Sequence, residues 1–258
     1  IVHMHDLVQL GLGSDSSMRQ PFLKRLQEGV VLFDGGMGTE LYRRGVFINK
    51  CYDELNLSNP ALVEQVHADY RQAGADVIET NTFGANAIKL KAHGLLDRLE
   101  EINRRGAEIA RTAAGEDGYV AGSIGPLGAQ MEPLGPLARS EVREMFARQI
   151  RALCEGGVDL FVLETFIYPE ELEQAILAVR EVFDNAVIAH ITINDDTTSL
   201  TGAQPGVLVR ELADMKPDVL GVNCTVGPAV MLTWLEHVRD FTEIPLSLMP
   251  NASKRKNV

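Results

Sequence analysis

The chain has 258 residues, of which 45% are hydrophobic and 23% are charged, so it can bury one large core and is not disordered. Its 24 Lys and Arg residues against 36 Asp and Glu residues give a formal net charge of −12, which argues against binding nucleic acid or anionic membrane surfaces. Three cysteines are too few for a disulfide framework, so we expect a reducing compartment and place the protein in the cytoplasm.

Residues 1–18 lack the basic start and the continuous apolar centre of a secretory signal. We interpret them as an N-terminal extension or as residues left from expression. One folded domain is predicted over residues 19–258. No stretch of the chain approaches the roughly 18–20 apolar residues that a membrane helix needs.

Seven short apolar runs follow, each about as long as a strand and apolar on both faces, which is typical of a covered parallel sheet. They are residues 30–33, 77–78, 119–124, 160–163, 186–193, 219–222 and 246–249. Amphipathic helical patterns separate the runs, and three of them begin at Pro60, Pro169 and Pro228, because proline is favoured in the first turn of a helix.

Polar residues directly follow many of these runs, as at Asp34, Glu79, Glu164 and Asn223. A barrel active site is assembled in this way from many carboxyl ends, whereas a doubly wound sheet gathers its site at one switch point. We therefore predict an α/β fold of the (β/α)8 TIM-barrel type. An eighth strand with its helices needs about 40–50 further residues, so we expect the barrel to lack its last βα unit in this chain.

The glycines after Asp34 are one candidate for ligand contact. Gly35 and Gly36 allow a ligand to approach the backbone closely, and free N–H groups there can bind a carboxylate. The alternative is a tight turn that needs a positive φ at these positions.

Glu79 and Glu164 each follow a buried run, where an ionised carboxylate needs a cationic partner. For Glu164 we favour the amino group of a substrate, and for Glu79 a Lys or Arg of the protein. No lysine ends a strand, since Lys89 and Lys91 lie in a helical segment, and this argues against a Schiff-base aldolase.

Cys224 ends the sixth run and is either a small buried residue or a metal ligand or nucleophile. Cys154 lies in a helical apolar pattern and is expected in the core, and Cys51 is expected to be structural. His190 lies within a strand and is interpreted as a hydrogen-bonded core histidine.

Seven motifs resemble the homocysteine S-methyltransferase family. They are FDGGMGTE at 33–40, DELNL at 53–57, GADVIETNTF at 74–83, GSIGPLG at 122–128, LETF at 163–166, GVNC at 221–224 and MPNA at 249–252. The similarity runs in register from about residue 22 to residue 252. Residues 52–57, 84–86 and 132–135 are most similar to the N-terminal domain of bifunctional enzymes that join this barrel to a methylenetetrahydrofolate reductase.

The resemblance implies a zinc ion held by three cysteines. One of them follows the sixth strand and corresponds to Cys224. The other two belong to a GGCCG motif that this sequence lacks, so two further cysteine ligands are expected beyond Val258. Zinc would deprotonate the thiol of homocysteine, which then accepts a methyl group to give methionine. The expected donor is 5-methyltetrahydrofolate, and the expected partner is a C-terminal methylenetetrahydrofolate reductase domain.

The resemblance also implies substrate contacts for matching residues. The amino group of homocysteine would be held by Asp34 and Glu164, and its polar end by Gly35, Gly36 and Thr80, while Asn223 lies beside the metal ligand. Met37, Phe83 and Phe166 are expected as apolar walls of the site or as core residues. Three alternatives stay open. The donor could be S-methylmethionine or another onium compound, or the chain could be a module of a cobalamin-dependent methionine synthase, although nothing in the sequence signals a cobalamin-binding domain. The third alternative is a non-catalytic ligand-binding barrel that has lost the second zinc motif.

Overall fold

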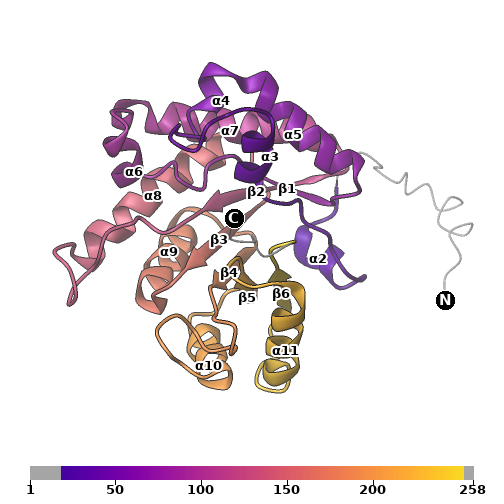
Figure 1. Cartoon of the computed structure of the whole chain (residues 1–258), viewed down its shortest axis with the longest axis vertical. Helices are drawn as coiled ribbons and strands as arrows, with labels where there is room; N and C mark the ends of the chain where they lie inside the picture. The colour runs from indigo at the N-terminus through magenta and orange to yellow at the C-terminus, as the bar shows by residue number, and fades with distance from the viewer. Residues whose placement is uncertain (1–18, 253–258) are drawn as a thin grey trace, which may run out of the picture.

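A computed structural model describes residues 19–252. Six parallel strands lie side by side in chain order and form one curled sheet with helices on its outside (Figure 1). The strands are β1 (Val77–Glu79), β2 (Tyr119–Ile124), β3 (Leu160–Phe166), β4 (Val187–Ile191), β5 (Val219–Asn223) and β6 (Leu246–Met249). This curled half-barrel is that of an incomplete TIM-type barrel and confirms the predicted fold class. The prediction for residues 1–18 lies outside the described residues.

The first predicted run, residues 30–33, does not form a regular strand. Only Phe33 pairs with β1, through a parallel bridge to Val77. Val30 is 81% exposed and Leu32 is 56% exposed, because no strand within residues 19–252 covers their other side. The prediction of seven strands is therefore wrong for this run, although its pairing still places Asp34 next to the end of β1.

The helices are α2 (Phe22–Leu26), α3 (Met37–Arg43), α4 (Leu55–Ser58), α5 (Pro60–Gln72), α6 (Ala87–Ala92), the 3-10 turn η1 (Leu96–Arg98), α7 (Leu99–Ala114), α8 (Arg139–Glu155), α9 (Pro169–Val182), α10 (Pro205–Asp214) and α11 (Pro228–Val238). Helices α2 to α5 precede β1 in the chain, and the later helices separate consecutive strands. The helix starts predicted at Pro60, Pro169 and Pro228 are confirmed. None of the helices described over residues 19–252 has both the length and the apolar character to cross a membrane.

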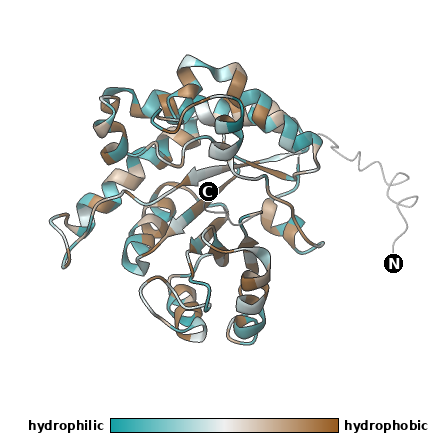
Figure 2. Cartoon of the chain, in the orientation of Figure 1, coloured by the Kyte–Doolittle hydropathy of each residue, from teal (hydrophilic) through white to brown (hydrophobic). Residues whose placement is uncertain are grey.

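The strands alternate between two apolar layers, as the two-residue period of a strand requires. Phe161 and Leu163 of β3 face the helices, where Phe146 and Trp234 are fully buried. Val162 of the same strand points into the barrel, whose amino-terminal end is covered by α2. Hydrophobic residues accordingly run along the strands and along α11 in Figure 2. Cys154 packs against the outer layer, which confirms its predicted place.

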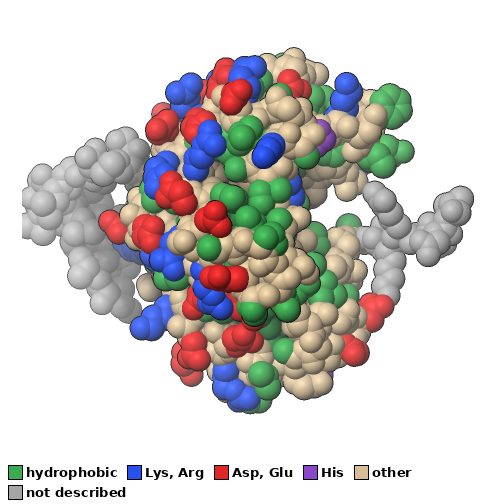
Figure 3. All heavy atoms as spheres, turned by 90° about the vertical axis from the view of Figure 1, so that its left-hand side faces the viewer, with side chains coloured by type: hydrophobic (Ala, Val, Ile, Leu, Met, Phe, Trp, Pro, Cys, Tyr) green, Lys and Arg blue, Asp and Glu red, His purple; other side chains and the backbone are tan. Residues whose placement is uncertain are grey.

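The outer face of the helices carries charges of both signs side by side (Figure 3). Exposed ion pairs join neighbouring helices there, such as Arg148 of α8 with Glu100 of α7 and Arg143 of α8 with Glu181 of α9. Exposed pairs of this kind contribute little to stability. Because these exposed pairs contribute little, the polar residues at the ends of the strands are the candidates for a functional site.

Candidate active site

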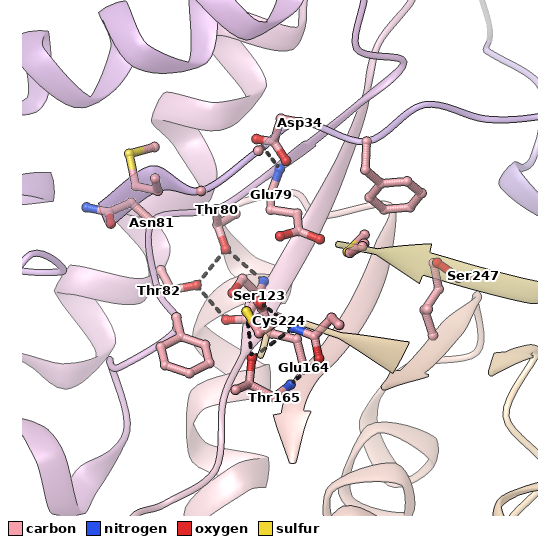
Figure 4. A pocket seen from close by; sticks show the side chains of 18 of the residues that line it. Asp34, Glu79, Thr80, Asn81, Thr82, Ser123, Glu164, Thr165, Cys224 and Ser247 are labelled. Carbon is pink, nitrogen blue, oxygen red and sulfur yellow. Dashed lines mark hydrogen bonds between the residues drawn. The ribbon is translucent and has the colours of Figure 1, made fainter. Parts of the chain in front are cut away.

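A cavity of about 1660 Å³ occupies the open half-barrel. At the carboxyl ends of the strands it is lined by polar side chains that converge from separate elements (Figure 4). These are Asp34, Glu79, Thr80, Ser123, Glu164, Thr165, Asn223 and Cys224. The structure thus brings together the residues predicted from the strand ends.

Asp34 and Glu79 lie together through a backbone contact. Asp34 Oδ2 accepts a hydrogen bond from the Glu79 N–H at 3.0 Å. The other oxygen, Asp34 Oδ1, and the Glu79 Oε1 atom are buried and have no hydrogen-bond partner among the described residues. Burial and neighbouring carboxylates raise the pKa of both groups well above their ordinary values. No Lys or Arg of residues 19–252 forms an ion pair with Glu79, so the protein cation expected for this residue stays a prediction.

Glu164 leaves β3 towards the same cavity and is held by two donors. Ser123 Oγ donates to its Oε1 at 2.5 Å, and Asn223 Nδ2 donates to its Oε2 at 3.3 Å. Burial raises the pKa of Glu164, while the Ser123 hydrogen bond and the charge of Lys89 act in the opposite direction. The carboxylate is therefore fixed in position but has no ion-pair partner within 4.0 Å among the described residues.

Two hydrogen bonds between Asn223 and Thr165 join the ends of β5 and β3. The Thr165 N–H donates to Asn223 Oδ1 at 2.8 Å, and Asn223 Nδ2 donates to Thr165 Oγ1 at 2.8 Å. Cys224 Sγ lies 3.6 Å from Asn223 Nδ2 and 3.8 Å from Thr165 Oγ1. Thr165 and Cys224 have φ values of 63° and 56°, which are uncommon for residues with a side chain and cluster at functional sites.

The Thr80 hydroxyl belongs to a buried network. Its Oγ1 accepts from the Ser123 N–H at 3.0 Å and lies 2.5 Å from Thr82 Oγ1. Because Thr82 Oγ1 donates to the Ser123 carbonyl at 2.9 Å, the proton shared between the two threonines comes from Thr80. Thr80 therefore has an acceptor position left but no donor, so its hydroxyl suits an ammonium group and not a carboxylate.

Gly35 and Gly36 line the cavity with ordinary backbone angles, so the alternative of a turn with positive φ is wrong. Gly35 is needed for a close approach instead, because a Cβ atom there would lie 2.8 Å from Tyr70 Oη. Gly36 precedes the first residue of α3 and caps that helix. Their contact with a substrate carboxylate stays a prediction.

Several other predicted residues divide between the site and the core. Met37 and Phe83 line the cavity, whereas Phe166 is fully buried against Phe146, with ring centroids 6.0 Å apart. Cys51 also lines the cavity, and burial together with the charge of Asp53 raises its pKa to about 11. The structural role predicted for Cys51 stays a prediction.

His190 of β4 is fully buried, as predicted, but neither ring nitrogen has a hydrogen-bond partner among the described residues. The hydrogen bond expected for His190 is not made to any residue of 19–252 and stays a prediction. Burial lowers the pKa of His190 to about 3, so the ring is neutral at pH 7.

Lys89 is a cavity residue that sequence reasoning missed. It lies on α6, away from the strand ends, and its Nζ is 4.6 Å from the centroid of the Phe83 ring. Its predicted place in a helix is confirmed, and no lysine of the described residues ends a strand, but the helix brings this lysine to the cavity wall. A helix position next to GADVIETNTF was the only sequence signal that could have found it.

The described residues fit a zinc ion only in part. Within residues 19–252, no three His, Cys, Asp or Glu side chains come together as a metal-binding group. Cys224 offers one thiol at the cavity wall, and its pKa is raised mainly by burial. Since a zinc site needs about three protein ligands, Cys224 can be one ligand but cannot form the site alone.

Comparisons with known proteins agree with this architecture. Residues 31–257 match the family model described as Homocysteine S-methyltransferase. The methionine synthases of Mycobacterium tuberculosis and Mycobacterium leprae are each 33% identical to the chain, over 88% and 89% of its length. The chain spans 20% of the length of these two relatives.

Solved structures share the fold. The homocysteine methyltransferase MmuM from Escherichia coli, in its metallated form, superimposes with a TM-score of 0.79 at 25% identity, covering 91% of this chain and 88% of that chain. The carboxyl transferase domain of Rhizobium etli pyruvate carboxylase has a TM-score of 0.54 at 14% identity, covers 90% of this chain and 40% of that chain, and shows the fold alone. With the family model matching most of its length, the chain belongs to the homocysteine S-methyltransferase family of enzymes.

Proposed function

We propose that this protein transfers a methyl group from 5-methyltetrahydrofolate to the thiol of homocysteine, giving methionine and tetrahydrofolate. The observation that carries the proposal is that Asp34 and Glu164 line the same cavity as the free thiol of Cys224. Both carboxylates are buried and have no ion-pair partner among residues 19–252. Homocysteine carries an ammonium group and a thiol on one short carbon chain. Its ammonium group therefore suits the carboxylates of Asp34 and Glu164, and its thiol suits a metal bound at Cys224.

The ammonium group of homocysteine would be the cation that faces these carboxylates. Asp34 Oδ1 has no partner within residues 19–252, and Thr80 Oγ1 has only an acceptor position left. Glu164 already accepts from Ser123 and Asn223, which hold its carboxylate in position. Binding an ammonium would stabilise the ionised carboxylates that burial disfavours, which makes the site selective for an amino acid over a simple thiol.

The rest of the substrate would be oriented by the neighbouring loops. Gly35 and Gly36 are proposed to contact the carboxylate of homocysteine through their backbone. Asn223 is proposed as a positioning residue, because it bonds both Glu164 and Cys224. Met37 and Phe83 provide apolar wall on the same side of the cavity.

Zinc is proposed as the metal, with Cys224 as one ligand and two further cysteine ligands that these 258 residues do not contain. When bound, zinc is a Lewis acid that favours the thiolate form of a substrate thiol at neutral pH. In the transfer, a bond forms between the substrate sulfur and the methyl carbon as the bond between that carbon and the donor nitrogen breaks. The nitrogen keeps the electron pair and takes up a proton.

Two parts of the proposal rest on the resemblance and on composition. A methylenetetrahydrofolate reductase domain is proposed as a partner of the barrel. The cytoplasm is proposed as the location, because Cys51, Cys154 and Cys224 are all free thiols.

The test is to incubate the intact, zinc-loaded protein with homocysteine and one methyl donor at a time, and to quantify methionine by mass spectrometry. Methionine formed from 5-methyltetrahydrofolate is the expected result. Methionine formed only from S-methylmethionine would overturn the donor and keep the acceptor. No methionine from either donor, with homocysteine still bound, would favour a non-catalytic binding barrel.

A further inference from the structure

Lys89 is held against the cavity by the local structure around α6. Asn86 caps this helix, since its Oδ1 accepts from the Lys89 N–H at 3.0 Å. The side chain then runs beside Gly128, where an added Cβ would lie 3.5 Å from Lys89 Cε. Its ammonium lies over Phe83, and both residues line the cavity.

The Lys89 ammonium has no hydrogen-bond or ion-pair partner among residues 19–252. Asp53, Glu171 and Glu164 are near enough to influence its charge, but each already accepts hydrogen bonds from other groups. Asp53 accepts from the Gly84 N–H at 2.9 Å, Glu171 from the Leu127 N–H at 2.7 Å, and Glu164 from Ser123 and Asn223. An ammonium has three donors, and a contact with an aromatic face uses its charge but satisfies none of them in the way an oxygen does. Burying such a group without an acceptor is unfavourable.

The carboxylates on the other side of the cavity make this arrangement more specific. Among residues 19–252, neither Asp34 nor Glu79 is paired with a cation, although Lys89 lies without an ionic partner in the same cavity. If Lys89 served only to neutralise the protein's own carboxylates, a direct ion pair would be expected, and none lies within 4.0 Å. A cavity that holds a positive group, Lys89, apart from the carboxylates of Asp34 and Glu79 can bind a zwitterion, or two substrates of opposite charge.

We propose that Lys89 is the anion-binding residue of the cavity and takes a carboxylate of a bound substrate. This inference rests on the proposed function, because both proposed substrates carry carboxylates: homocysteine at its α-carbon and 5-methyltetrahydrofolate in its glutamate tail. The same positive charge, placed on the face of Phe83, occupies the aromatic surface that a sulfonium or ammonium donor would use and repels such a donor.

The experiment measures binding to the intact, zinc-loaded protein by isothermal titration calorimetry. The probes are homocysteine, 3-aminopropane-1-thiol, which is homocysteine without its carboxylate, and 5-methyltetrahydrofolate. Lys89→Met removes the charge and keeps an unbranched side chain of similar length. Lys91→Met is the matched control, because Lys91 lies on the same helix but is exposed and does not line the cavity. Lys89→Gln replaces the first variant if that one does not fold, as judged by circular dichroism.

Loss of a hydrogen bond to a charged group predicts about 10-fold or greater weakening for Lys89→Met and no change for Lys91→Met. If Lys89→Met binds homocysteine more weakly but binds 3-aminopropane-1-thiol as before, Lys89 contacts the carboxylate of homocysteine. If only the binding of 5-methyltetrahydrofolate becomes weaker, Lys89 contacts the carboxylate of this methyl donor. Unchanged binding of all three probes would overturn the proposal for Lys89 and leave the proposed function standing. If the unaltered protein binds neither substrate, the proposed function itself is overturned, and the role of Lys89 with it.

Discussion

The side-chain amide of Asn223 on β5 donates a hydrogen bond to Glu164 Oε2 on β3 over 3.3 Å, although β4 separates these two strands. The same amide lies 3.6 Å from Cys224 Sγ. One residue thus fixes the carboxylate proposed to bind the ammonium of homocysteine relative to the thiol proposed to bind the metal. Because a substrate joins these two points, a small displacement of Glu164 would move the substrate thiol away from its reactive position.

Asn223→Ala tests this positioning role. The variant leaves the Thr165 N–H without its acceptor, so the free energy of unfolding should fall by about 1–3 kcal/mol. The Kd for homocysteine should rise about 10-fold, because Glu164 loses a donor, while the Kd for 5-methyltetrahydrofolate stays unchanged. Calorimetry with each substrate gives this comparison, and Asn185→Ala in an exposed loop is the control. Equal loss of affinity for both substrates would indicate a purely structural role.

Cys224→Ser tests the metal ligand. A hydroxyl is a much poorer zinc ligand than a thiolate, so the variant should lose its zinc and its methyl transfer. The fold should persist, because Cys224 is only partly buried and lies outside the two apolar layers. Elemental analysis of the purified protein gives the zinc content, and Cys154→Ser on α8 is the control that should keep it. A full zinc content in Cys224→Ser would remove this residue from the metal site.

Glu164→Gln tests the ammonium site. The amide keeps the size of the side chain and loses the charge, so homocysteine should bind about 10-fold to 100-fold more weakly, or about 1.5–3 kcal/mol. The measurement is the Kd for homocysteine by calorimetry. Glu155→Gln, at the exposed end of α8, should change nothing. Unchanged affinity in the first variant would show that the ammonium group binds elsewhere.

The sequence was sufficient to predict site residues that lie at the end of a strand. Glu164 and Asn223 each come at the end of a run of apolar residues, and parallel strands of a barrel bring such ends together. Their mutual hydrogen bond could not be predicted, since it crosses over β4 and depends on the curvature of the sheet. The resemblance to the family predicted which residues contact the substrate. It did not predict which of their hydrogen-bonding positions are already taken by other residues of the protein, as they are for the Thr80 hydroxyl.

The structure differs from the sequence-based predictions at three places, and each of them depends on neighbours that are distant in the sequence. Residues 30–33 have the composition of a strand, but a strand needs partners on its edges, and β1 alone leaves Val30 exposed. Gly35 is explained by Tyr70, 35 residues away along the chain, and not by its own φ. Lys89 enters the cavity because of where α6 packs, which its helical pattern does not encode.

Glu79→Gln should show how the buried carboxylate of Glu79 affects stability. Burial and neighbouring carboxylates raise the pKa of Glu79 in the folded protein, so between its unfolded and folded pKa values the folded state binds a proton that the unfolded state does not. The stability that this group contributes is therefore present at low pH and is lost as pH rises through the folded pKa. Each pH unit in that window costs up to about 1.4 kcal/mol.

Without bound substrate, Glu79→Gln should consequently be more stable than the unaltered protein near pH 7, and the difference should shrink towards pH 4. Urea unfolding at a series of pH values measures this difference directly. Addition of homocysteine should reduce it, because the ammonium group stabilises the ionised site. A stability difference that does not vary with pH would show that Glu79 does not titrate in this way.

His190 should act in the opposite direction. Its folded pKa of about 3 lies below the ordinary value of 6.5, so at intermediate pH the unfolded chain binds a proton that the buried ring does not. Stability is therefore complete above pH 6.5 and falls by up to about 1.4 kcal/mol for each unit as pH decreases towards 3. His67 of α5, with a pKa lowered by burial to about 4, adds a second contribution of the same sign.

His190→Leu removes the titrating ring and fills its apolar surroundings with a side chain of similar size. The free energy of unfolding should then depend less steeply on pH between 6.5 and 4 than it does in the unaltered protein. Urea unfolding at each pH gives the slopes of both proteins. Because neither ring nitrogen of His190 has a hydrogen-bond partner among residues 19–252, the variant should also be no less stable than the unaltered protein at pH 7. A marked loss of stability at that pH would indicate that His190 makes a hydrogen bond to a group outside residues 19–252.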